Sequence, residues 1–282
     1  MSYWRECPRC GAALDPGEQC DCQVNSEASM MLSPTAPLAT ERSSAERIRA
    51  LPTEERDVRG PSPTAGYGVP MRIRARDREE WLRLRKNGIG GSDAAAALGL
   101  SPWTSPLELW LQKTGQKTEL DLSNNADVAE GVRMESPLRE LFRAMHPALT
   151  VEHRPFDMIY QSGRPHSFST LDGEYYLNDA PNERGILEIK RCMPTSRAKW
   201  EEWDGRVPQH YYIQILKQLG DTGYQMATLL AALIRQNGEI LIREYTFRRE
   251  QLEEDIAFVV DGVDRFWRCV QERRRPPVVL TM

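Results

Sequence analysis

Two short apolar runs that carry charged residues at fixed places constrain this chain more than any other feature. The run over 168–177 contains Asp172 followed by Gly173, a pattern typical of a strand, a bend and a second strand. Turn-forming residues occupy 178–185, and another strand is expected over 186–192. The chain is therefore expected to build a sheet with acidic residues at its edge.

The strand over 186–192 places charge on one side only. Side chains alternate along a strand, so Glu188 and Lys190 share one face, while Leu187 and Ile189 take the other. If the strands pair, Asp172 reaches the charged face. Two carboxylates and an ammonium are costly to bury without a compensating partner, and a divalent metal ion is such a partner. A cross-strand ion pair on a solvated face is the alternative interpretation.

This set of charges is typical of metal-dependent phosphodiester hydrolysis. Mg²⁺, or Mn²⁺ in its place, binds through a few carboxylates together with the substrate phosphate. We expect Asp172 and Glu188 to ligate the metal ion and the backbone carbonyl of Ile189 to add an oxygen. Lys190 is expected to orient the attacking water or to offset charge on the phosphate.

A glycine-rich turn upstream predicts a phosphate contact. Three glycines within 88–91 allow close approach of the backbone to a ligand and positive φ. Ser92 is expected to cap a short alanine-rich helix over 93–98, and a helix N-terminus beside such a turn suits a phosphate. Together with Arg85 just before it, the turn predicts a phosphate site; the alternative is a tight connection between two helices.

The remaining pattern predicts an α/β fold with a mixed central β-sheet flanked by helices. Pro137 is expected to bend or interrupt one helix, and the Gln236-Asn237-Gly238 turn is expected to join two strands. The helices are expected over 105–115, 126–145, 194–204, 208–219 and 249–273. The two strands are expected over 224–234 and 239–247.

The order of these motifs resembles the YqaJ-type viral recombinases, relatives of phage lambda exonuclease in the PD-(D/E)XK nuclease superfamily. The resemblance covers about residues 78–235. The segments that carry it are 79–103, 105–115, 129–142, 171–173, 188–190 and 207–214. One departure is Ser-Thr-Leu-Asp-Gly where many relatives have Ser-Pro-Asp-Gly, which leaves the carboxylate of Asp172 in place.

The resemblance implies a restriction-endonuclease-like core and further site residues. Glu135 is implied as an additional carboxylate at the metal site and Gln214 as a polar helper there. Arg85 and Ser92 are implied to hold the phosphate of a DNA end. The family also implies 5′-to-3′ polarity, a ring-like homotrimer that threads DNA, and a partner protein that anneals single strands.

The first seventy residues lie outside this resemblance. Four of the six cysteines lie close together there: Cys7, Cys10, Cys20 and Cys22. Their Cys-Pro-x-Cys-Gly and Cys-x-Cys spacing predicts a structural four-thiolate Zn²⁺ site in a knuckle-like module over 1–24, with free thiols or a disulfide as the alternative. Residues 25–70 lack sustained apolar periodicity and are expected to be a flexible linker. Residues 71–282 are then the nuclease domain.

Composition narrows the class of protein. No apolar run approaches the ~18 residues of a membrane span, so we expect no membrane contact and a location in the cytoplasm or at the nucleoid of a bacterial or phage-infected cell. The formal net charge of −4 counts against non-specific coating of nucleic acid. Basic character is instead local: Arg72, Arg74, Arg76, Arg78, Arg83, Arg85 and Lys86 precede the glycine turn.

The sequence therefore predicts a Mg²⁺-dependent exonuclease that hydrolyses linear double-stranded DNA to leave single strands for recombination. One alternative is a structure- or site-selective DNA endonuclease. The other is a non-catalytic module that binds DNA ends or a protein.

Overall fold

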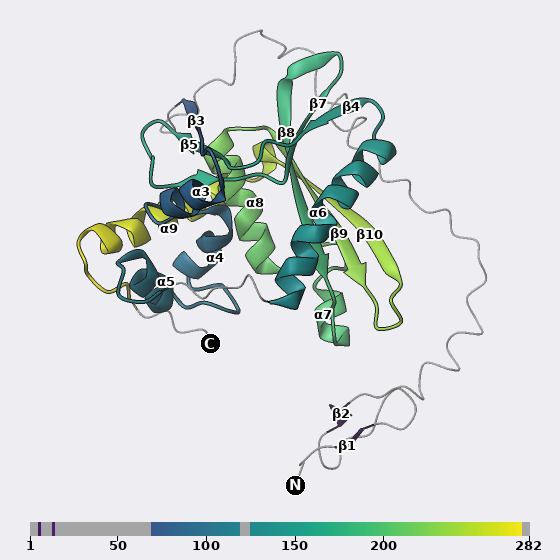
Figure 1. Cartoon of the computed structure of the whole chain (residues 1–282), viewed down its shortest axis with the longest axis horizontal. Helices are drawn as coiled ribbons and strands as arrows, with labels where there is room; N and C mark the ends of the chain where they lie inside the picture. The colour runs from purple at the N-terminus through teal and green to yellow at the C-terminus, as the bar shows by residue number, and fades with distance from the viewer. Residues whose placement is uncertain (1–4, 7–12, 15–68, 119–124, 278–282) are drawn as a thin grey trace, which may run out of the picture. The chain divides into compact units, whose positions relative to one another are not determined.

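The computed structural model describes residues 5–6, 13–14, 69–118 and 125–277 (Figure 1). The chain divides into two compact units, Met1–Glu41 and Arg42–Met282. In the first unit, strand β1 (Arg5–Glu6) pairs antiparallel with β2 (Ala13–Leu14). The four cysteines predicted to bind zinc lie outside the described residues, as does the predicted linker except for its last two residues.

A mixed five-stranded sheet forms the centre of the second unit, as the sequence predicts. Its strand order is β10-β9-β8-β7-β4, with β8 and β9 parallel and the other neighbours antiparallel. The strands are β4 (Leu149–Glu152), β7 (Gly173–Leu177), β8 (Ala180–Cys192), β9 (Met226–Ile234) and β10 (Ile240–Arg248). A second sheet has the order β3-β5-β6, formed by β3 (Pro70–Arg74), β5 (Asp157–Gln161) and β6 (Phe168–Ser169).

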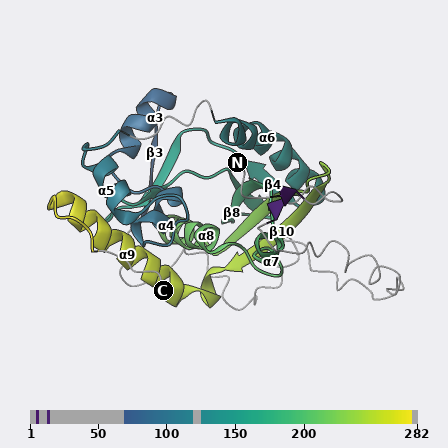
Figure 2. The same cartoon turned by 90° about the horizontal axis from the view of Figure 1, so that it is seen from below.

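Helices cover both faces of the five-stranded sheet (Figures 1 and 2). The helices are α3 (Arg78–Arg85), α4 (Ala94–Ala97), α5 (Pro106–Lys113), α6 (Ala126–Met145), α7 (Arg197–Glu201), α8 (Gln209–Thr222) and α9 (Glu253–Gln271), with short 3₁₀ turns η3 (Gly91–Asp93) and η4 (Arg249–Gln251). Helix α8 lies in the connection between the parallel strands β8 and β9, as such a connection requires. No helix in the described ranges is both long and apolar enough to pass through a bilayer.

Two apolar clusters hold these layers together. On one face, Ile215 and Leu219 of α8 are buried with residues of α4, α9 and the sheet. On the other face, Leu138 and Phe142 of α6 pack in one cluster with Leu187 and Ile189 of β8 and their neighbours. The alternation predicted for β8 is therefore observed, since Leu187 and Ile189 lie on the α6 side. The opposite face of β8 is left to Glu188 and Lys190.

The strand and turn boundaries around the acidic motif differ from the prediction. The first strand ends at Ser169, Asp172 lies in a bend, and Gly173 already begins β7. The turn predicted over 178–185 shrinks to two residues, because β8 starts at Ala180. Its exposed first residues extend the antiparallel ladder with β7, and pairing outweighs the turn preference of their side chains.

Two helix predictions need correction. Helix α6 runs without interruption from Ala126 to Met145 through Pro137, so the loss of one backbone hydrogen bond is offset by packing of its buried residues. Not every apolar residue of α6 faces the core: Val132 is 61% exposed. The helix predicted over 194–204 is limited to α7, capped by Ser196. By contrast, Ser105 caps α5 as predicted, accepting a hydrogen bond from the Glu108 N–H at 3.2 Å.

Candidate active site

The carboxylate of Asp172 is fixed at the end of a ladder of backbone hydrogen bonds. Strand β7 pairs with β8 up to Gly173, which lies opposite Leu187. Two residues further along β8, the Ile189 N–H donates to Oδ2 of Asp172 at 2.8 Å, so the side chain takes the place of the next backbone acceptor. The backbone carbonyl of Asp172 is itself held by Nε of Arg139 at 2.7 Å. The structure thus brings Asp172 to the edge of β8, between two sheets that meet at this bend.

Glu188 is almost fully buried, with 2% of its surface exposed, and is held by three donors. Its Oε1 accepts from Nε2 of Gln214 at 2.5 Å and lies 2.6 Å from Nζ of Lys190. Its Oε2 accepts from Nε2 of Gln218 at 2.6 Å. Gln214 and Gln218 lie one turn apart on α8, where residues i and i+4 share a face. Gln218 was not among the residues predicted from the sequence, although its i+4 relation to Gln214 was a signal.

The acidic side chains lie in surroundings that disfavour their charge. Burial raises the pKa of Asp172 well above its usual value, and the negative charges of Glu188 and Glu135 raise it further. Burial also raises the pKa of Glu135, on α6, and the charge of Glu188 adds to this effect. Burial alone would lower the pKa of Lys190, but the carboxylates of Glu188 and Asp172 raise it overall, so the ammonium keeps its proton. A cation bound here would favour the charged forms of these carboxyl groups.

The atoms available to bind a metal ion here are hard oxygens. Asp172 and Glu188 offer carboxylates beside the Ile189 backbone, a donor set that suits Mg²⁺ or Mn²⁺ rather than a thiophilic metal. Within the described ranges, however, no three His, Cys, Asp or Glu side chains lie close enough together to hold a metal ion. Glu135 is linked to the pair by its charge. Glu188 already accepts from three donors, which leaves about one acceptor position of its carboxylate for a metal ion.

The glycine turn is fixed to the strand that leads to Asp172. The Ile89 N–H donates to the His166 carbonyl at 2.8 Å, and a Cβ on Gly88 would lie only 2.5 Å from that same oxygen. Positive φ is not the reason for these glycines, since neither Gly88 nor Gly91 adopts it. Ser92 lies inside the 3₁₀ turn η3 rather than at the N-cap of α4, which corrects the predicted cap.

Arg85 and Ser92 lie together on this turn. Nη2 of Arg85 donates to Oγ of Ser92 at 3.4 Å, and the guanidinium lies 4.7 Å from the ring centre of Trp81. Asp93, the residue that would repel an anion here, is paired with Nζ of Lys113 at 3.0 Å. Burial would raise the pKa of Asp93, but the charges of Lys113 and Arg85 lower it overall, so its carboxylate is ionised and compensated.

Helix α8 connects the turn to the acidic pocket. A Cβ built on Gly91 would lie 3.6 Å from Cγ of Gln214 and 3.7 Å from Cγ of Gln218, the two amides that hold Glu188. The structure therefore brings the predicted phosphate-binding turn beside the predicted metal site.

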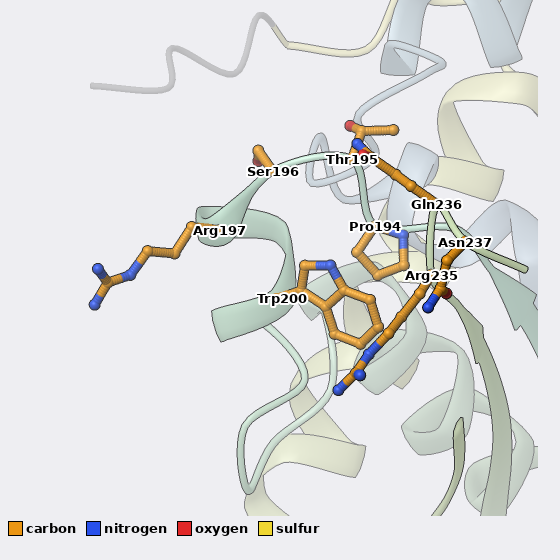
Figure 3. A pocket seen from close by; sticks show the side chains of 8 residues that line it. All are labelled: Pro194, Thr195, Ser196, Arg197, Trp200, Arg235, Gln236 and Asn237. Carbon is orange, nitrogen blue, oxygen red and sulfur yellow. The ribbon is translucent and has the colours of Figure 1, made fainter. Parts of the chain in front are cut away.

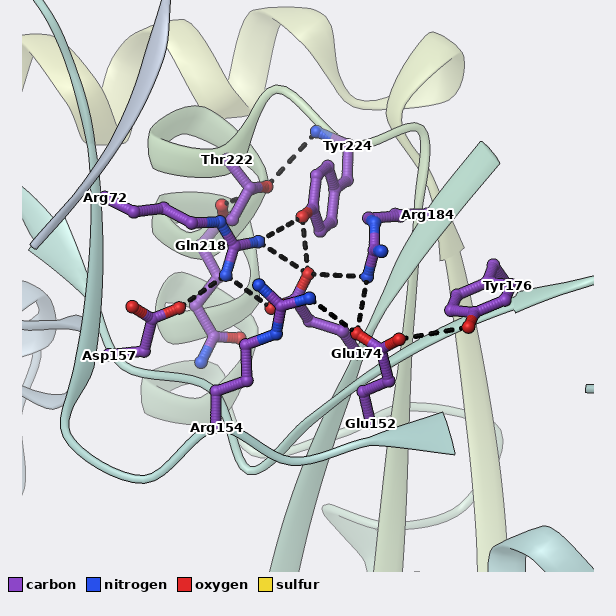
Figure 4. A network of polar contacts seen from close by, with 10 residues as sticks. All are labelled: Arg72, Glu152, Arg154, Asp157, Glu174, Tyr176, Arg184, Gln218, Thr222 and Tyr224. Atoms are coloured by element: carbon purple, nitrogen blue, oxygen red, sulfur yellow. Dashed lines mark hydrogen bonds and ion pairs between the residues drawn. The ribbon is translucent and has the colours of Figure 1, made fainter. Parts of the chain in front are cut away.

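Several of the basic residues that precede the glycine turn are paired with acids. Arg72 forms ion pairs with Asp157 at 2.5 Å and Glu174 at 2.6 Å, and it donates to the Tyr224 hydroxyl (Figure 4). These contacts tie β3 to β5 and β7, so Arg72 has a structural role. Arg76 and Arg83 each pair with Glu80. Arg85 faces the glycine turn, where it contacts Ser92 and lies 3.7 Å from the Asp93 carboxylate.

A surface hollow of about 410 Å³ lies beyond the end of β8 (Figure 3). Trp200 and Arg235 line it, while Arg197 points away from it. None of the acidic residues of the pocket around Glu188 lines this hollow. Cavity size alone therefore does not locate the chemistry in this molecule.

Comparisons with known proteins agree with this architecture. The uncharacterized protein YqaJ of Bacillus subtilis is 28% identical over 196 residues, which are 67% of this chain and 55% of that protein, so the match spans little more than half of this relative. The crystal structure of LHK-Exo, an alkaline exonuclease from Laribacter hongkongensis, matches with a TM-score of 0.51 at 20% identity, over 69% of this chain and 93% of that one.

The structure of LHK-Exo in complex with dAMP matches with the same TM-score at 19% identity and the same coverage. At these identities the two structures show a shared fold. The model of the YqaJ-like viral recombinase domain matches residues 80–225, which is more than half of the sequence. This chain therefore belongs to the YqaJ-like viral recombinase domain family.

Proposed function

We propose that this protein is a Mg²⁺-dependent deoxyribonuclease that degrades linear double-stranded DNA from its ends. The observation that carries the proposal is that Asp172 binds the Ile189 N–H close enough to Glu188 for the two charges to interact, with Lys190 bound to Glu188. Membership of the YqaJ-like family and the fold shared with an alkaline exonuclease support the same function.

The metal ion would be held by Asp172, Glu188 and the carbonyl of Ile189, with Glu135 as a further carboxylate. In a strand the carbonyl and N–H of one residue point to the same edge, so the Ile189 carbonyl faces the side on which β7 has ended. The raised pKa values of Asp172 and Glu135 fit a site whose charges are balanced by a bound cation. When bound, Mg²⁺ supplies Lewis-acid polarisation of the phosphate and lowers the pKa of a water.

The side chains around the proposed metal site orient its ligands and the attacking water, and they balance negative charge. Lys190 keeps its ammonium next to Glu188 and is placed to orient the attacking water or to offset charge on the phosphate. Gln214 and Gln218 fix the Glu188 carboxylate from α8, and both side chains lie beside Gly91 of the glycine turn. Gln214 would support the reaction from this position. Arg85 and Ser92 hold the phosphate of the DNA end, since a guanidinium beside a hydroxyl forms charge-assisted hydrogen bonds to phosphate oxygens.

We extend the proposal to direction and partners. On the strength of the family, the enzyme acts 5′ to 3′ as a ring-like trimer, leaves single strands for recombination and works with a protein that anneals them. It acts in the cytoplasm or at the nucleoid.

The test uses the purified full chain with Mg²⁺. Linear duplex labelled at either 5′ or 3′ ends should be degraded, with the 5′ label released first, while covalently closed circles stay intact. Glu188→Gln should lose at least about 100-fold in rate, because the variant lacks a metal-binding charge. Glu183→Gln, on the exposed part of the same strand, is the matched control and should retain the rate. Rapid nicking of circles would point instead to an endonuclease, and intact linear duplex would reject the proposal.

For the first unit, we propose a structural Zn²⁺ bound by Cys7, Cys10, Cys20 and Cys22. The spacing of the cysteines in the sequence supports it. Purified protein should contain one zinc per chain by elemental analysis, and Cys7→Ser with Cys10→Ser should abolish it. Zinc-free wild-type protein would refute this proposal without affecting the nuclease.

A further inference from the structure

Trp103 is a large apolar side chain that the fold leaves in solvent. Its indole is 70% exposed, more than any other large hydrophobic residue in the described ranges. The loop that carries it, between α4 and α5, is held by Oγ of Ser101, which accepts from the N–H groups of Trp103 at 3.2 Å and Thr104 at 3.3 Å. The indole therefore projects into solvent from a backbone that is fixed by hydrogen bonds. Burial in the core does not explain why a tryptophan occupies this position.

The exposed indole rests on His210, in the first turn of α8. The two ring centres lie 4.6 Å apart in an edge-to-face arrangement with an interplanar angle of 79°. Burial, with the nearby charge of Lys190 as the next cause, lowers the pKa of His210 to about 4, so its ring is neutral at physiological pH. Its Nε2 is shielded and has no hydrogen-bond partner among the described residues. His210 therefore acts as an uncharged ring that supports the indole.

A continuous line of rings leads from Trp103 to the candidate active site. The ring centre of Tyr211 lies 4.0 Å from that of His210, and Nζ of Lys190 lies 5.1 Å from the Tyr211 ring. Together with the 4.6 Å contact, these spacings keep Trp103 within about 14 Å of the Lys190 ammonium, the rise of about four stacked nucleotides. An aromatic surface at this distance lies within reach of a DNA strand whose phosphate is bound beside Lys190.

We propose that Trp103, supported by His210, is a stacking platform for one unpaired nucleobase of the DNA strand bound at the active site. The proposal rests on the nuclease function proposed above. An aromatic face binds any base, because every base has a π-face, and an enzyme that degrades DNA along its length needs contacts that do not depend on sequence. The platform would hold the strand in register while the phosphate beside Lys190 is hydrolysed.

The first test measures equilibrium binding without hydrolysis. A fluorescently labelled 12-nucleotide single strand and a duplex with a short overhang are titrated with the full chain in EDTA. Trp103→Ala should weaken binding about 5- to 100-fold, as expected for loss of one base–aromatic stack. Trp103→Phe should stay within about 3-fold of wild type. Phe258→Ala is the matched control, because Phe258 is an aromatic ring on α9 that is 60% exposed and outside the site.

The second test locates the stacked base. Single strands with one abasic position, moved stepwise along the oligonucleotide, should bind wild type more weakly when the missing base is the one on Trp103. Trp103→Ala should be insensitive to that same position, so the two losses are not additive.

Wild-type affinity of Trp103→Ala, or additive losses at every abasic position, would overturn the platform even if wild type degrades linear DNA. Binding with the predicted abasic dependence, but no hydrolysis with Mg²⁺, would instead reject the proposed nuclease and keep the base site.

Discussion

The backbone N–H of Ile189 and the Oδ2 atom of Asp172 are joined by a hydrogen bond of 2.8 Å, and this bond sets the register of the candidate active site. Strand side chains alternate, so a slip of one residue along β8 would turn Glu188 and Lys190 away from α8 and into the apolar cluster beneath α6. The contact thus fixes which side chains of β8 face α8.

Gln218→Leu should weaken the apparent Mg²⁺ affinity of the enzyme by about 10- to 100-fold, as is typical when a residue that orients a metal ligand is lost. The reason is that Gln218 holds Oε2 of Glu188 from a fully buried position. The measurement is the Mg²⁺ concentration that gives half the maximal rate on linear duplex. Gln209→Leu, at the exposed start of α8, is the control and should leave this concentration unchanged. Equal values for Gln218→Leu and wild type would show that the amide does not orient the carboxylate.

The sequence pattern was sufficient to predict those helices and strands whose limits depend only on residues within the element or its turn. The bounds predicted for the helix over 126–145 are those observed for α6, and Asn-Gly at 237–238 correctly predicted the hairpin between β9 and β10. The alternation over 186–192 correctly separated Glu188 and Lys190 from Leu187 and Ile189. Each of these follows from period or turn chemistry that is present in a short window.

Long-range pairing was beyond the reach of such patterns. Strand β3 pairs with β5 across more than eighty residues, and the ion pairs of Arg72 that hold it have no local signature. For the same reason the sequence did not show that Arg72, one of the basic residues before the glycine turn, is paired with Asp157 and Glu174 (Figure 4). Gln218 was missed because its role depends on β8 packing against α8, which no window of sequence contains.

Gly88→Ala should destabilise the protein by about 1–3 kcal/mol, while Gly91→Ala should cost much less. A Cβ at Gly88 would lie 2.5 Å from the backbone oxygen of His166, which cannot move without breaking its bond to Ile89, whereas a Cβ at Gly91 meets its neighbours at 3.6 Å or more. Urea unfolding of both variants is the measurement. Similar losses for the two would show that the glycine turn adapts, contrary to its fixed attachment.

Asp172→Asn should stabilise the metal-free protein at pH 8 and have little effect near pH 4. Burial raises the folded pKa of Asp172 above its usual 3.8, so the folded state binds this proton more tightly than the unfolded state. The stability that this provides is complete below the ordinary pKa and is lost as pH rises through the raised one. Asparagine avoids the loss, so Asp172→Asn should be the more stable protein at pH 8.

Thermal unfolding in EDTA across pH 4–8 measures this difference. Adding Mg²⁺ should then stabilise wild type and leave Asp172→Asn nearly unchanged, because binding to the folded state alone raises stability. A difference between the proteins that is independent of pH would show that the Asp172 charge is already compensated without metal.

Lys217 and Asp221 form an ion pair on α8 with essentially no exposure, and single substitutions there should be severe. The Ser167 and Ser169 hydroxyls donate to the Asp221 carboxylate at 2.7 Å, and Nζ of Lys217 donates to the Phe168 carbonyl at 2.8 Å, so the pair fastens α8 to β6. Lys217→Met leaves a buried carboxylate without its cation and should cost about 3–5 kcal/mol. Lys217→Met with Asp221→Leu removes both charges and should cost less than the sum of the two single changes. Urea unfolding of the four proteins gives this coupling directly, and strictly additive losses would mean that the two charges are solvated independently rather than paired.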